Sequence, residues 1–246
     1  MDEITDFWGY NIKISVIIPF YCPDENTEKF FQRCKESIDP RFRLICREDK
    51  KHEGVSAMRN KGLDYLYKND PPDYITFLDA DDTMNPDAWE QMTKAIAEEP
   101  DEPVIQMNHL RKKDGTVYSR FHNHRGTYYP DRIPQFWFVV WNKVFKADFI
   151  RDIRFIEGLQ HGEDELFILE CLAKSGRIYC SEKIAMTHHF DNEQSLSRNV
   201  SANDLIGEQQ ALIGFLQEHQ EDRRVCEAVR LRQLELWNNN TYKTVF

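Results

Sequence analysis

Three carboxylates within four residues are the sharpest chemical feature of the sequence, in the segment Asp79-Ala80-Asp81-Asp82. Carboxylates this close repel one another and lose solvation when they are buried. A divalent cation relieves both costs, and alternating acids suit Mg²⁺ or Mn²⁺, which can also bind phosphate oxygens. An isolated acidic pair is usually a solvated turn. This one follows an apolar run and precedes a helix start, so we expect a metal site.

A second feature is the segment Gly54-Val-Ser-Ala-Met-Arg-Asn-Lys-Gly62. Small residues at its start, among them Ser56, let the beginning of a helix approach a ligand closely, and the free backbone amides there suit an anion. Arg59 could reach a phosphate or a base carbonyl. The alternative is an ordinary helix start with an exposed arginine.

A third acidic group, Glu163-Asp164-Glu165, follows Gly162 and precedes the apolar stretch Leu-Phe-Ile-Leu. One carboxylate at a helix N-terminus is stabilised by the helix dipole and by backbone amides. Three acids exceed what capping requires, so we expect one of them to act as a base.

Apolar runs and turn signals place the first two segments in an alternating α/β pattern. We expect strands at 13–20, 42–46 and 73–78, and helices at 25–38, 54–68 and from Asn85-Pro86, where Asn would cap the helix and Pro would occupy its first turn. This order is typical of a doubly wound, mainly parallel sheet flanked by helices. Ligands of such sheets bind beyond the carboxyl ends of the strands, which here carry Phe20-Tyr21, Glu48-Asp49 and the acids at 79–82.

The second half of the chain has a different pattern. We expect a hairpin of strands 104–110 and 116–121, a helix at 163–173, strands at 177–180 and 184–189, and two C-terminal helices at 203–218 and 221–237. The apolar positions of the last two helices fit packing onto the body at least as well as a partner surface.

Composition excludes several classes of protein. The net charge of −10 disfavours a protein that coats nucleic acid. The six cysteines form no C-x-x-C pair, which disfavours a zinc ribbon and favours reduced thiols. The N-terminus lacks the pattern of a secretory signal, and the apolar runs are far shorter than the ~20 residues of a membrane span. We therefore expect a cytoplasmic protein, with peripheral association at a membrane surface as the alternative.

Six segments, taken in order, resemble the family-2 glycosyltransferases of the GT-A fold, over about residues 13–198. They are Ile14-Ser-Val-Ile-Ile-Pro-Phe-Tyr21, Gly54-Val-Ser-Ala-Met-Arg-Asn60, Phe77-Leu-Asp-Ala-Asp-Asp82, Trp141-Asn-Lys-Val-Phe145, Gly162-Glu-Asp-Glu-Leu-Phe167 and Ser195-Leu-Ser197. The resemblance implies a catalytic domain at 1–200, with a nucleotide-binding half (13–100) and an acceptor-side half (101–200). A helical extension would follow at 201–246.

The resemblance also implies a role for individual residues. The nucleotide-sugar pocket would be lined by Pro19, Phe20, Tyr21, Ser56, Arg59, Asp79 and Ala80. Asp81 would be the principal ligand of Mn²⁺ or Mg²⁺, with Asp79 and either His188 or His189 beside it, although a structural histidine pair is the alternative. Asp164 would be the general base that deprotonates an acceptor hydroxyl in an inverting transfer, supported by Glu163. The donor would be a nucleoside-diphosphate sugar, most simply a UDP-sugar.

One turn departs from the family pattern. Family members usually have an Asp-Asp-Gly-Ser turn after the second strand, whose first acid contacts uracil. This chain has Arg47-Glu-Asp-Lys-Lys51 at that place, so Glu48 or Asp49 would have to substitute.

A local excess of positive charge lies between residues 109 and 125. It comprises Arg111, Lys112, Lys113, Arg120 and Arg125, with His109, His122 and His124. One interpretation is a solvated hairpin. The other is a surface for an anionic acceptor, such as a lipid-linked phosphate or a polyanionic glycan, with nucleic acid less favoured.

Two alternatives to a glycosyltransferase stay open. A nucleotidyltransferase that makes sugar nucleotides shares a doubly wound core, but it needs a Gly-rich basic loop where this chain has Tyr21-Cys-Pro-Asp24. A relative that only binds nucleotide sugars is disfavoured by the intact Asp79, Asp81 and Asp164.

Overall fold

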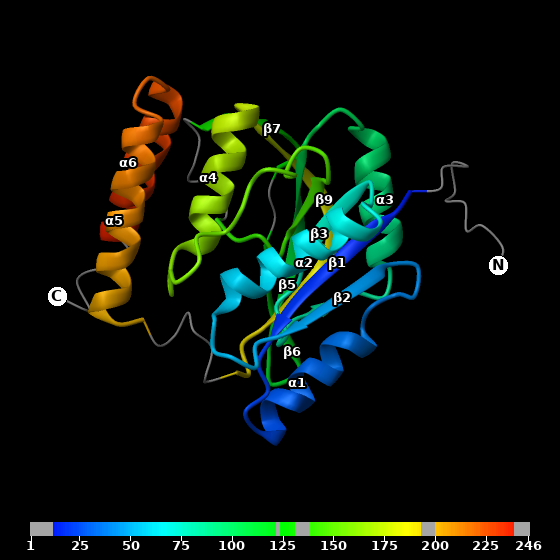
Figure 1. The fold of residues 1–246 in the computed structure, drawn as a ribbon. Coiled ribbons are helices and arrows are strands. Elements are labelled where there is room, and N and C mark those ends of the chain that lie inside the picture. Colours follow the sequence, from blue (N-terminus) through cyan, green and yellow to red (C-terminus); the bar gives the residue numbers. More distant parts are fainter. Residues whose placement is uncertain (1–11, 122–123, 131–137, 193–199, 239–246) are drawn as a thin grey trace.

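The computed structural model describes residues 12–121, 124–130, 138–192 and 200–238, which form a mixed β-sheet with helices on both faces (Figure 1). Its strands are β1 (Ile14–Phe20), β2 (Arg43–Glu48), β3 (Tyr74–Phe77), β4 (Thr83–Met84), β5 (Val104–Lys113), β6 (Thr116–Phe121), β7 (Gly126–Tyr128), β8 (Lys143–Lys146) and β9 (Ile178–His189). Its helices are α1 (Glu25–Glu36), α2 (Val55–Asn69), α3 (Ala88–Glu98), α4 (Glu163–Ser175), α5 (Ala202–Glu218) and α6 (Arg223–Asn238).

The predicted fold class, a mainly parallel sheet between helices, is confirmed. The main path of the sheet runs β2-β1-β3-β8-β5-β9-β4. Strands β2, β1, β3, β5 and β9 run in one direction, while β8 and β4 run against them. The first three strands therefore end at the same edge of the sheet, which brings together the segments after Phe20, Glu48 and Phe77.

Alternation along β1 divides the apolar core between the two faces of the sheet. Val16 and Ile18 point toward the layer that contains residues of α1 and α3, whereas Ile17 points toward the layer of α2 and α4. Gly62 lets α2 approach β1 closely, because a Cβ at that position would lie 2.6 Å from Cγ2 of Ile17.

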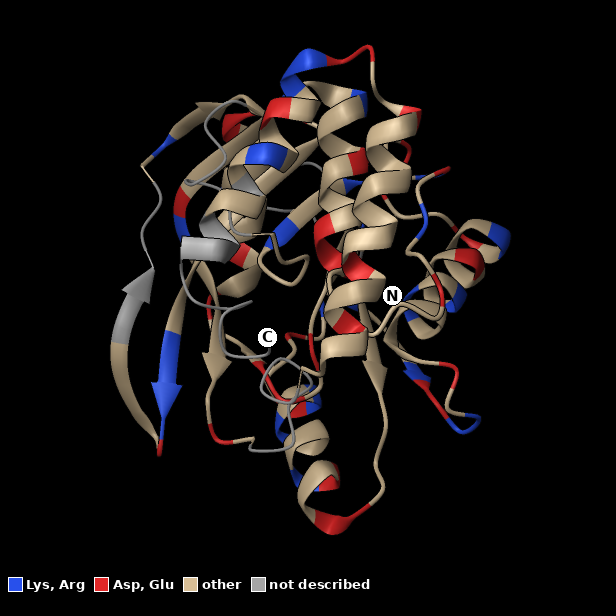
Figure 2. Cartoon of the chain, turned by 90° about the vertical axis from the view of Figure 1, so that its left-hand side faces the viewer, with Lys and Arg blue, Asp and Glu red and all other residues tan. Residues whose placement is uncertain are grey.

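The two C-terminal helices pack against α4 on one side of the molecule, and Figure 2 shows this helical side face on. Leu212 and Phe215 of α5 and Val225 and Val229 of α6 are buried in the same core cluster as α4. The sequence left open whether these apolar positions pack onto the body or form a partner surface, and the structure shows them packed onto the body. The division into a domain of 1–200 and an extension of 201–246 stays a prediction.

The expected cap of α3 is wrong. The N-cap residue is Asp87, and the helix starts at Ala88. Asn85 instead joins β4 to β9, since its amide nitrogen donates to the carbonyl of Ala185 and its side chain accepts a 2.7 Å hydrogen bond from the Thr187 hydroxyl. The strands predicted at 177–180 and 184–189 are one continuous strand, β9.

All six cysteines are free thiols. Cys34, Cys171 and Cys180 are buried, and burial raises the pKa of each thiol well above its ordinary value. Among the described helices, none combines the length and apolar character that a membrane span requires.

Candidate active site

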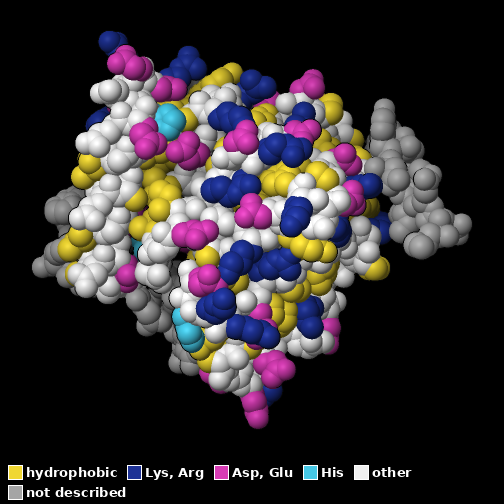
Figure 3. Space-filling model, viewed as in Figure 1, with side chains coloured by type: hydrophobic (Ala, Val, Ile, Leu, Met, Phe, Trp, Pro, Cys, Tyr) yellow, Lys and Arg dark blue, Asp and Glu magenta, His cyan; other side chains and the backbone are white. Residues whose placement is uncertain are grey.

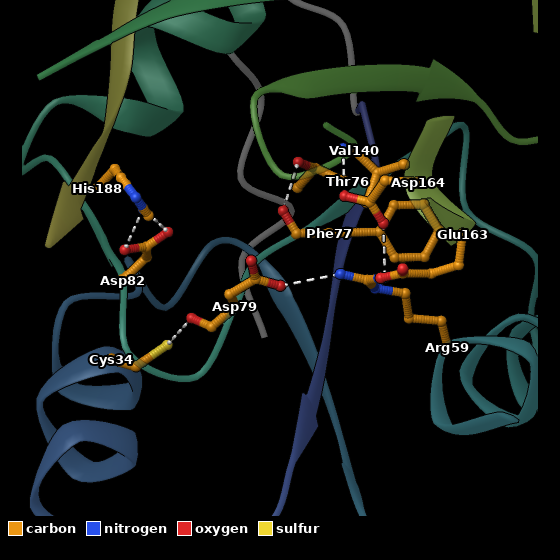
Figure 4. Close-up of polar contacts among 10 residues, drawn as sticks. All are labelled: Cys34, Arg59, Thr76, Phe77, Asp79, Asp82, Val140, Glu163, Asp164 and His188. Atoms are coloured by element: carbon orange, nitrogen blue, oxygen red, sulfur yellow. Dashed lines mark hydrogen bonds and ion pairs between the residues drawn. The ribbon is translucent and has the colours of Figure 1, made fainter. Parts of the chain in front are cut away.

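Arg59 of α2 joins the two acidic segments that the sequence singles out. Its guanidinium is buried and contacts the carboxylates of Asp79 at 3.0 Å, Glu163 at 3.1 Å and Asp164 at 2.6 Å. Figure 4 shows the side chain reaching between Asp79 and the acidic pair at the start of α4. The end of β3 and the start of α4 therefore form one site, although they are far apart in sequence.

The charges around Arg59 do not cancel. One guanidinium faces three carboxylates, so the group carries excess negative charge when all three are ionised. Burial raises the pKa of Asp164; Arg59 opposes this, whereas Glu163 and Asp79 add to it. The other oxygen of Asp164 accepts a 3.0 Å hydrogen bond from the amide of Val140, which fixes the orientation of the carboxylate. A carboxylate held in this way, with a pKa moved toward neutrality, suits proton transfer.

The other end of the acidic turn is bound to β9. Asp82 is buried, and its two oxygens each lie 3.0 Å from Nδ1 of His188, while the amide of His189 donates to Oδ1 at 2.8 Å. Burial raises the pKa of Asp82 to about 7, although His188 acts in the opposite direction. The imidazole of His188 stacks on Trp141 with 5.1 Å between ring centroids. Asp82 and His188 lie on the far side of Asp79 from Arg59 (Figure 4).

Asp79 and His188 both lie near Asp81, and these three stay the predicted ligands of a divalent cation. Among the described residues, the group whose ligand atoms lie within 4.8 Å of one another is instead Glu170, Glu218 and His219. Burial and the neighbouring Asp79 raise the pKa of Asp81, so negative charge is poorly compensated here. One oxygen of Asp81 accepts from Asn192 at 2.8 Å. Because Nδ1 of His188 contacts Asp82, its Nε2 is the nitrogen that could bind a metal, and a carboxylate behind a histidine ligand is common in metal sites. The two carboxylates fit Mn²⁺ or Mg²⁺, whereas an imidazole ligand is more typical of transition metals than of Mg²⁺.

The neighbouring His189 has a different environment. Its Nε2 lies 2.9 Å from the hydroxyl of Thr83, and burial lowers its pKa to about 4. The side chain is therefore neutral and connects β9 to β4, which fits the alternative of a structural histidine at this position.

The predicted aromatic wall of the nucleotide pocket lies at the end of β1. Phe20 stacks on Phe31 of α1 at 3.9 Å, and Pro19 pairs with Arg47 in the sheet. Tyr21 is 49% exposed and touches the ring of His52 edge-on. Tyr21 is thus the aromatic side chain at this edge that a base could reach. Of the small residues, Ala80 is partly buried and Ser56 is buried at the start of α2.

The two acids after β2 differ in their contacts. Asp49 is buried and accepts 2.8 Å hydrogen bonds from the amides of Glu53 and Gly54. Burial alone would raise the pKa of Asp49, but the hydrogen bonds from these amides lower it. Asp49 therefore fixes the loop that leads into α2. Glu48 forms an ion pair with Lys50 at 3.0 Å, and because both side chains are exposed it is the more accessible of the two acids.

The structure separates the residues of the predicted basic cluster. His109 is buried inside the sheet beside Trp141, and Arg125 donates to the hydroxyl of Tyr179 at 2.8 Å. His122 and the side chain of Arg120 lie outside the described residues, as does the Ser195–Ser197 motif. On the face seen in Figure 3, Lys and Arg side chains instead gather over β2 and α2. There Arg47 lies 4.5 Å from the centroid of the exposed Tyr65 ring.

Sequence reasoning overlooked two acids of this region. The sequence gives no sign of the contact between Asp82 and His188. It also gives no sign that Glu208 of α5 contacts His161, just before the acidic pair, at 2.8 Å. Nothing in the local sequence around Glu208 indicates this contact, because it depends on how α5 packs on α4.

Comparison with known proteins identifies the family. The family model "Glycosyl transferase family 2" matches residues 22–154, which is more than half of the chain. The glycosyltransferase GlyA of Streptococcus pneumoniae serotype 4 is 29% identical over 181 residues, covering 67% of this chain and 24% of GlyA. EpsH of Bacillus subtilis is 27% identical over 144 residues, covering 53% of this chain and 39% of EpsH. The chain therefore spans about a quarter and two fifths of the lengths of these relatives.

Solved structures share the fold. S. aureus TarS 1–349 in complex with UDP-GlcNAc superposes with a TM-score of 0.67 at 18% identity, covering 89% of this chain and 72% of that one. The same TarS fragment in complex with UDP gives a TM-score of 0.66, covering 94% of this chain and 75% of that one.

Proposed function

We propose, from the premise that the chain belongs to glycosyl transferase family 2, a specific reaction. The chain transfers a sugar from a nucleoside-diphosphate sugar to an acceptor hydroxyl with inversion. The observation that supports this most is the position of Arg59, whose one guanidinium contacts Asp79 at 3.0 Å and Asp164 at 2.6 Å. A donor held at the end of β3 would therefore lie next to a carboxylate able to accept a proton.

Asp164 is the general base in this proposal. Its raised pKa and its fixed orientation suit removal of the acceptor proton while the hydroxyl oxygen attacks the sugar. Arg59 keeps the carboxylate in place and Glu163 supports it, and holding both substrates in line supplies much of the remaining rate enhancement. Asp79, Asp81 and His188 would hold Mn²⁺ or Mg²⁺, which, when bound, offsets negative charge on the departing diphosphate.

The donor is proposed to be a UDP-sugar. The support is the fold shared with TarS, whose structures hold UDP-GlcNAc and UDP, together with an exposed aromatic residue, Tyr21, and an exposed acid, Glu48, at the end of the first two strands. Residues 13–100 would bind this donor, and residues 101–200 would face the acceptor, a glycan or a lipid-linked sugar.

A panel of nucleotide sugars with Mn²⁺ tests the proposal. We expect release of a nucleoside diphosphate with one or a few donors, and loss of this release when the metal is chelated. Asp164→Asn should lower kcat by about 10²- to 10⁴-fold and leave nucleotide binding intact. Asp148→Asn, at an exposed carboxylate away from the site, is the matched control.

Three results would contradict it. Full activity of Asp164→Asn would show that another group is the base. Tight binding of a nucleotide sugar without any turnover would favour a non-catalytic binding protein. Release of pyrophosphate from a nucleoside triphosphate would identify a nucleotidyltransferase.

A further inference from the structure

Helix α5 contributes a buried acid to the turn that precedes the proposed base. Glu208 is 1% exposed, and its Oε2 accepts a 2.8 Å hydrogen bond from Nδ1 of His161. Its other oxygen, Oε1, has no hydrogen-bond partner among the described residues. A buried carboxylate costs free energy unless it is well paired, so its place against this turn calls for a physical explanation.

The same side chain packs against Gly162, the N-cap of α4. A Cβ on Gly162 would lie 2.6 Å from Cγ and 3.0 Å from Cδ of Glu208, and Gly162 has a φ of +81° that favours glycine. No side chain of the turn caps α4, because the N-cap residue is this glycine. Glu208 does not cap the backbone amides of α4; it holds the turn before the helix through its hydrogen bond to His161 and its close packing against Gly162.

We propose that Glu208 is a positioning residue for catalysis. By binding His161 and packing against Gly162, it sets the start of α4 and so the direction in which Glu163 and Asp164 point toward Arg59. The proposal rests on the proposed function, in which Asp164 is the base. It gives helix α5 a role in the active site in addition to covering the core.

The surroundings of His161 favour a charged pair. Glu208 and Asp204 face it from α5, and Glu163 and Glu165 face it from α4. The hydrogen bond that His161 donates to Glu208 raises the pKa of His161, and Glu163 and Glu165 act in the same direction against the effect of burial. Helix α5 is itself held in place by a capping box between Ser201 and Asp204.

Steady-state kinetics of the full chain test the proposal. We expect Glu208→Ala to lower kcat by about tenfold with an unchanged KM for the donor, because binding is intact and only the base is misplaced. Glu208→Gln keeps the shape and an acceptor for Nδ1, so it should recover most of kcat. If Glu208 acts through His161, the loss in the His161→Ala/Glu208→Ala double variant is smaller than the product of the single losses.

Leu212→Ala separates positioning from simple destabilisation. Leu212 is also buried on α5, so this variant should lower the Tm at least as much as Glu208→Ala while leaving kcat per folded molecule unchanged. Amide hydrogen exchange of the segment 161–168 gives a second readout that needs no turnover. Exchange there should rise in Glu208→Ala and stay near the wild-type rate in Leu212→Ala.

The outcomes distinguish this inference from the proposed function. If Asp164→Asn is inactive but Glu208→Ala has the kcat and exchange of the wild type, the positioning role alone is wrong. Equal losses of kcat in Leu212→Ala and Glu208→Ala would also overturn it. If Asp164→Asn is fully active, the proposed base is wrong, and the exchange experiment then decides separately whether Glu208 fixes the start of α4.

Discussion

Two different basic side chains, on opposite sides, hold the start of α4 in place. On the inner side, Arg59 of α2 contacts Glu163 and Asp164 and continues to Asp79 at the end of β3. On the outer side, His161 contacts Glu208 of α5. Arginine stays charged at every pH at which the protein is folded, whereas histidine changes its charge near neutrality.

This difference indicates that the Arg59 contacts determine the geometry of the site and that the His161–Glu208 contact has a smaller influence on it. The fork of Arg59 meets three carboxylates and is buried, so its loss leaves several charges without a partner. The outer contact has one hydrogen bond and depends on a proton. We therefore expect a large contribution from the inner side and a smaller one from the outer side, which is lost when His161 loses its proton.

Replacement of Arg59 should have the largest effect. Arg59→Met leaves buried carboxylates uncompensated and is expected to lower the free energy of unfolding by about 3–5 kcal/mol, with loss of activity. Arg59→Lys should recover only part of both, because an ammonium cannot reproduce the fork. Urea unfolding measures the change. If Arg59→Met costs no more stability than His161→Ala, the two sides do not differ as described.

The outer contact should depend on pH. The pKa of His161 is raised in the folded state, so the contribution of the pair is fully present below the ordinary histidine pKa and is lost as the pH rises through the raised value. At pH 6 we expect Glu208→Ala to cost about 1.5–3 kcal/mol, and clearly less at pH 8.5. Urea unfolding at both values checks this, with the exposed Glu218→Ala on the same helix as the control. A cost that is equal at both values would rule out the charged pair.

The two ends of α4 offer a matched pair of glycines. Gly162 has a φ of +81° and Gly176 a φ of +69°, but only a Cβ at Gly162 would collide with a neighbour, which is Glu208. Both Ala variants carry the backbone strain of about 1 kcal/mol, and Gly162→Ala should cost about 1.5 kcal/mol more. In a Glu208→Ala background this excess should disappear. Thermal unfolding of the four variants gives the answer.

The smallest effect is expected at the start of α5. The Ser201 hydroxyl accepts from the amide of Asp204 at 3.2 Å, so Ser201→Ala should lower stability by about 1 kcal/mol. Because the helix remains packed through Leu205 and Leu212, kcat should not change. If Ser201→Ala lowers kcat as much as Glu208→Ala does, the position of the whole helix α5 affects catalysis more than the Glu208 contact does.

Sequence reasoning singled out the residues that meet around Arg59, but not the contacts that surround them. Arg59, Asp79 and Asp164 occur in short segments whose residue types carry their own signal, and the family they indicate is confirmed by the family model. Strands β1, β2 and β3 and helices α1, α2 and α3 also follow from apolar runs and turn signals, apart from the start of α3. A short pattern of this kind can be recognised in the sequence, because it depends only on a local arrangement of the chain.

Other parts of the site follow from packing between distant segments. Asp82 and His188 are far apart in sequence, and their contact depends on the pairing of β4 with β9. β4 has only two residues and β8 four, too few for a periodic pattern to stand out. Asn85 has the residue type of a helix cap, but the competing contact with Thr187 prevails. Glu208 belongs to an amphipathic helix in which a buried acid has no local signature.

The buried thiols provide a probe of local unfolding in each layer of the protein. Cys34 lies in the core cluster of α1 and α3, while Cys171 and Cys180 lie in the cluster of α2 and α4. A thiol that is protonated and shielded reacts with an alkylating reagent only after the structure around it opens. The rate at which each cysteine is alkylated would therefore show whether the two faces of the sheet unfold together or one before the other.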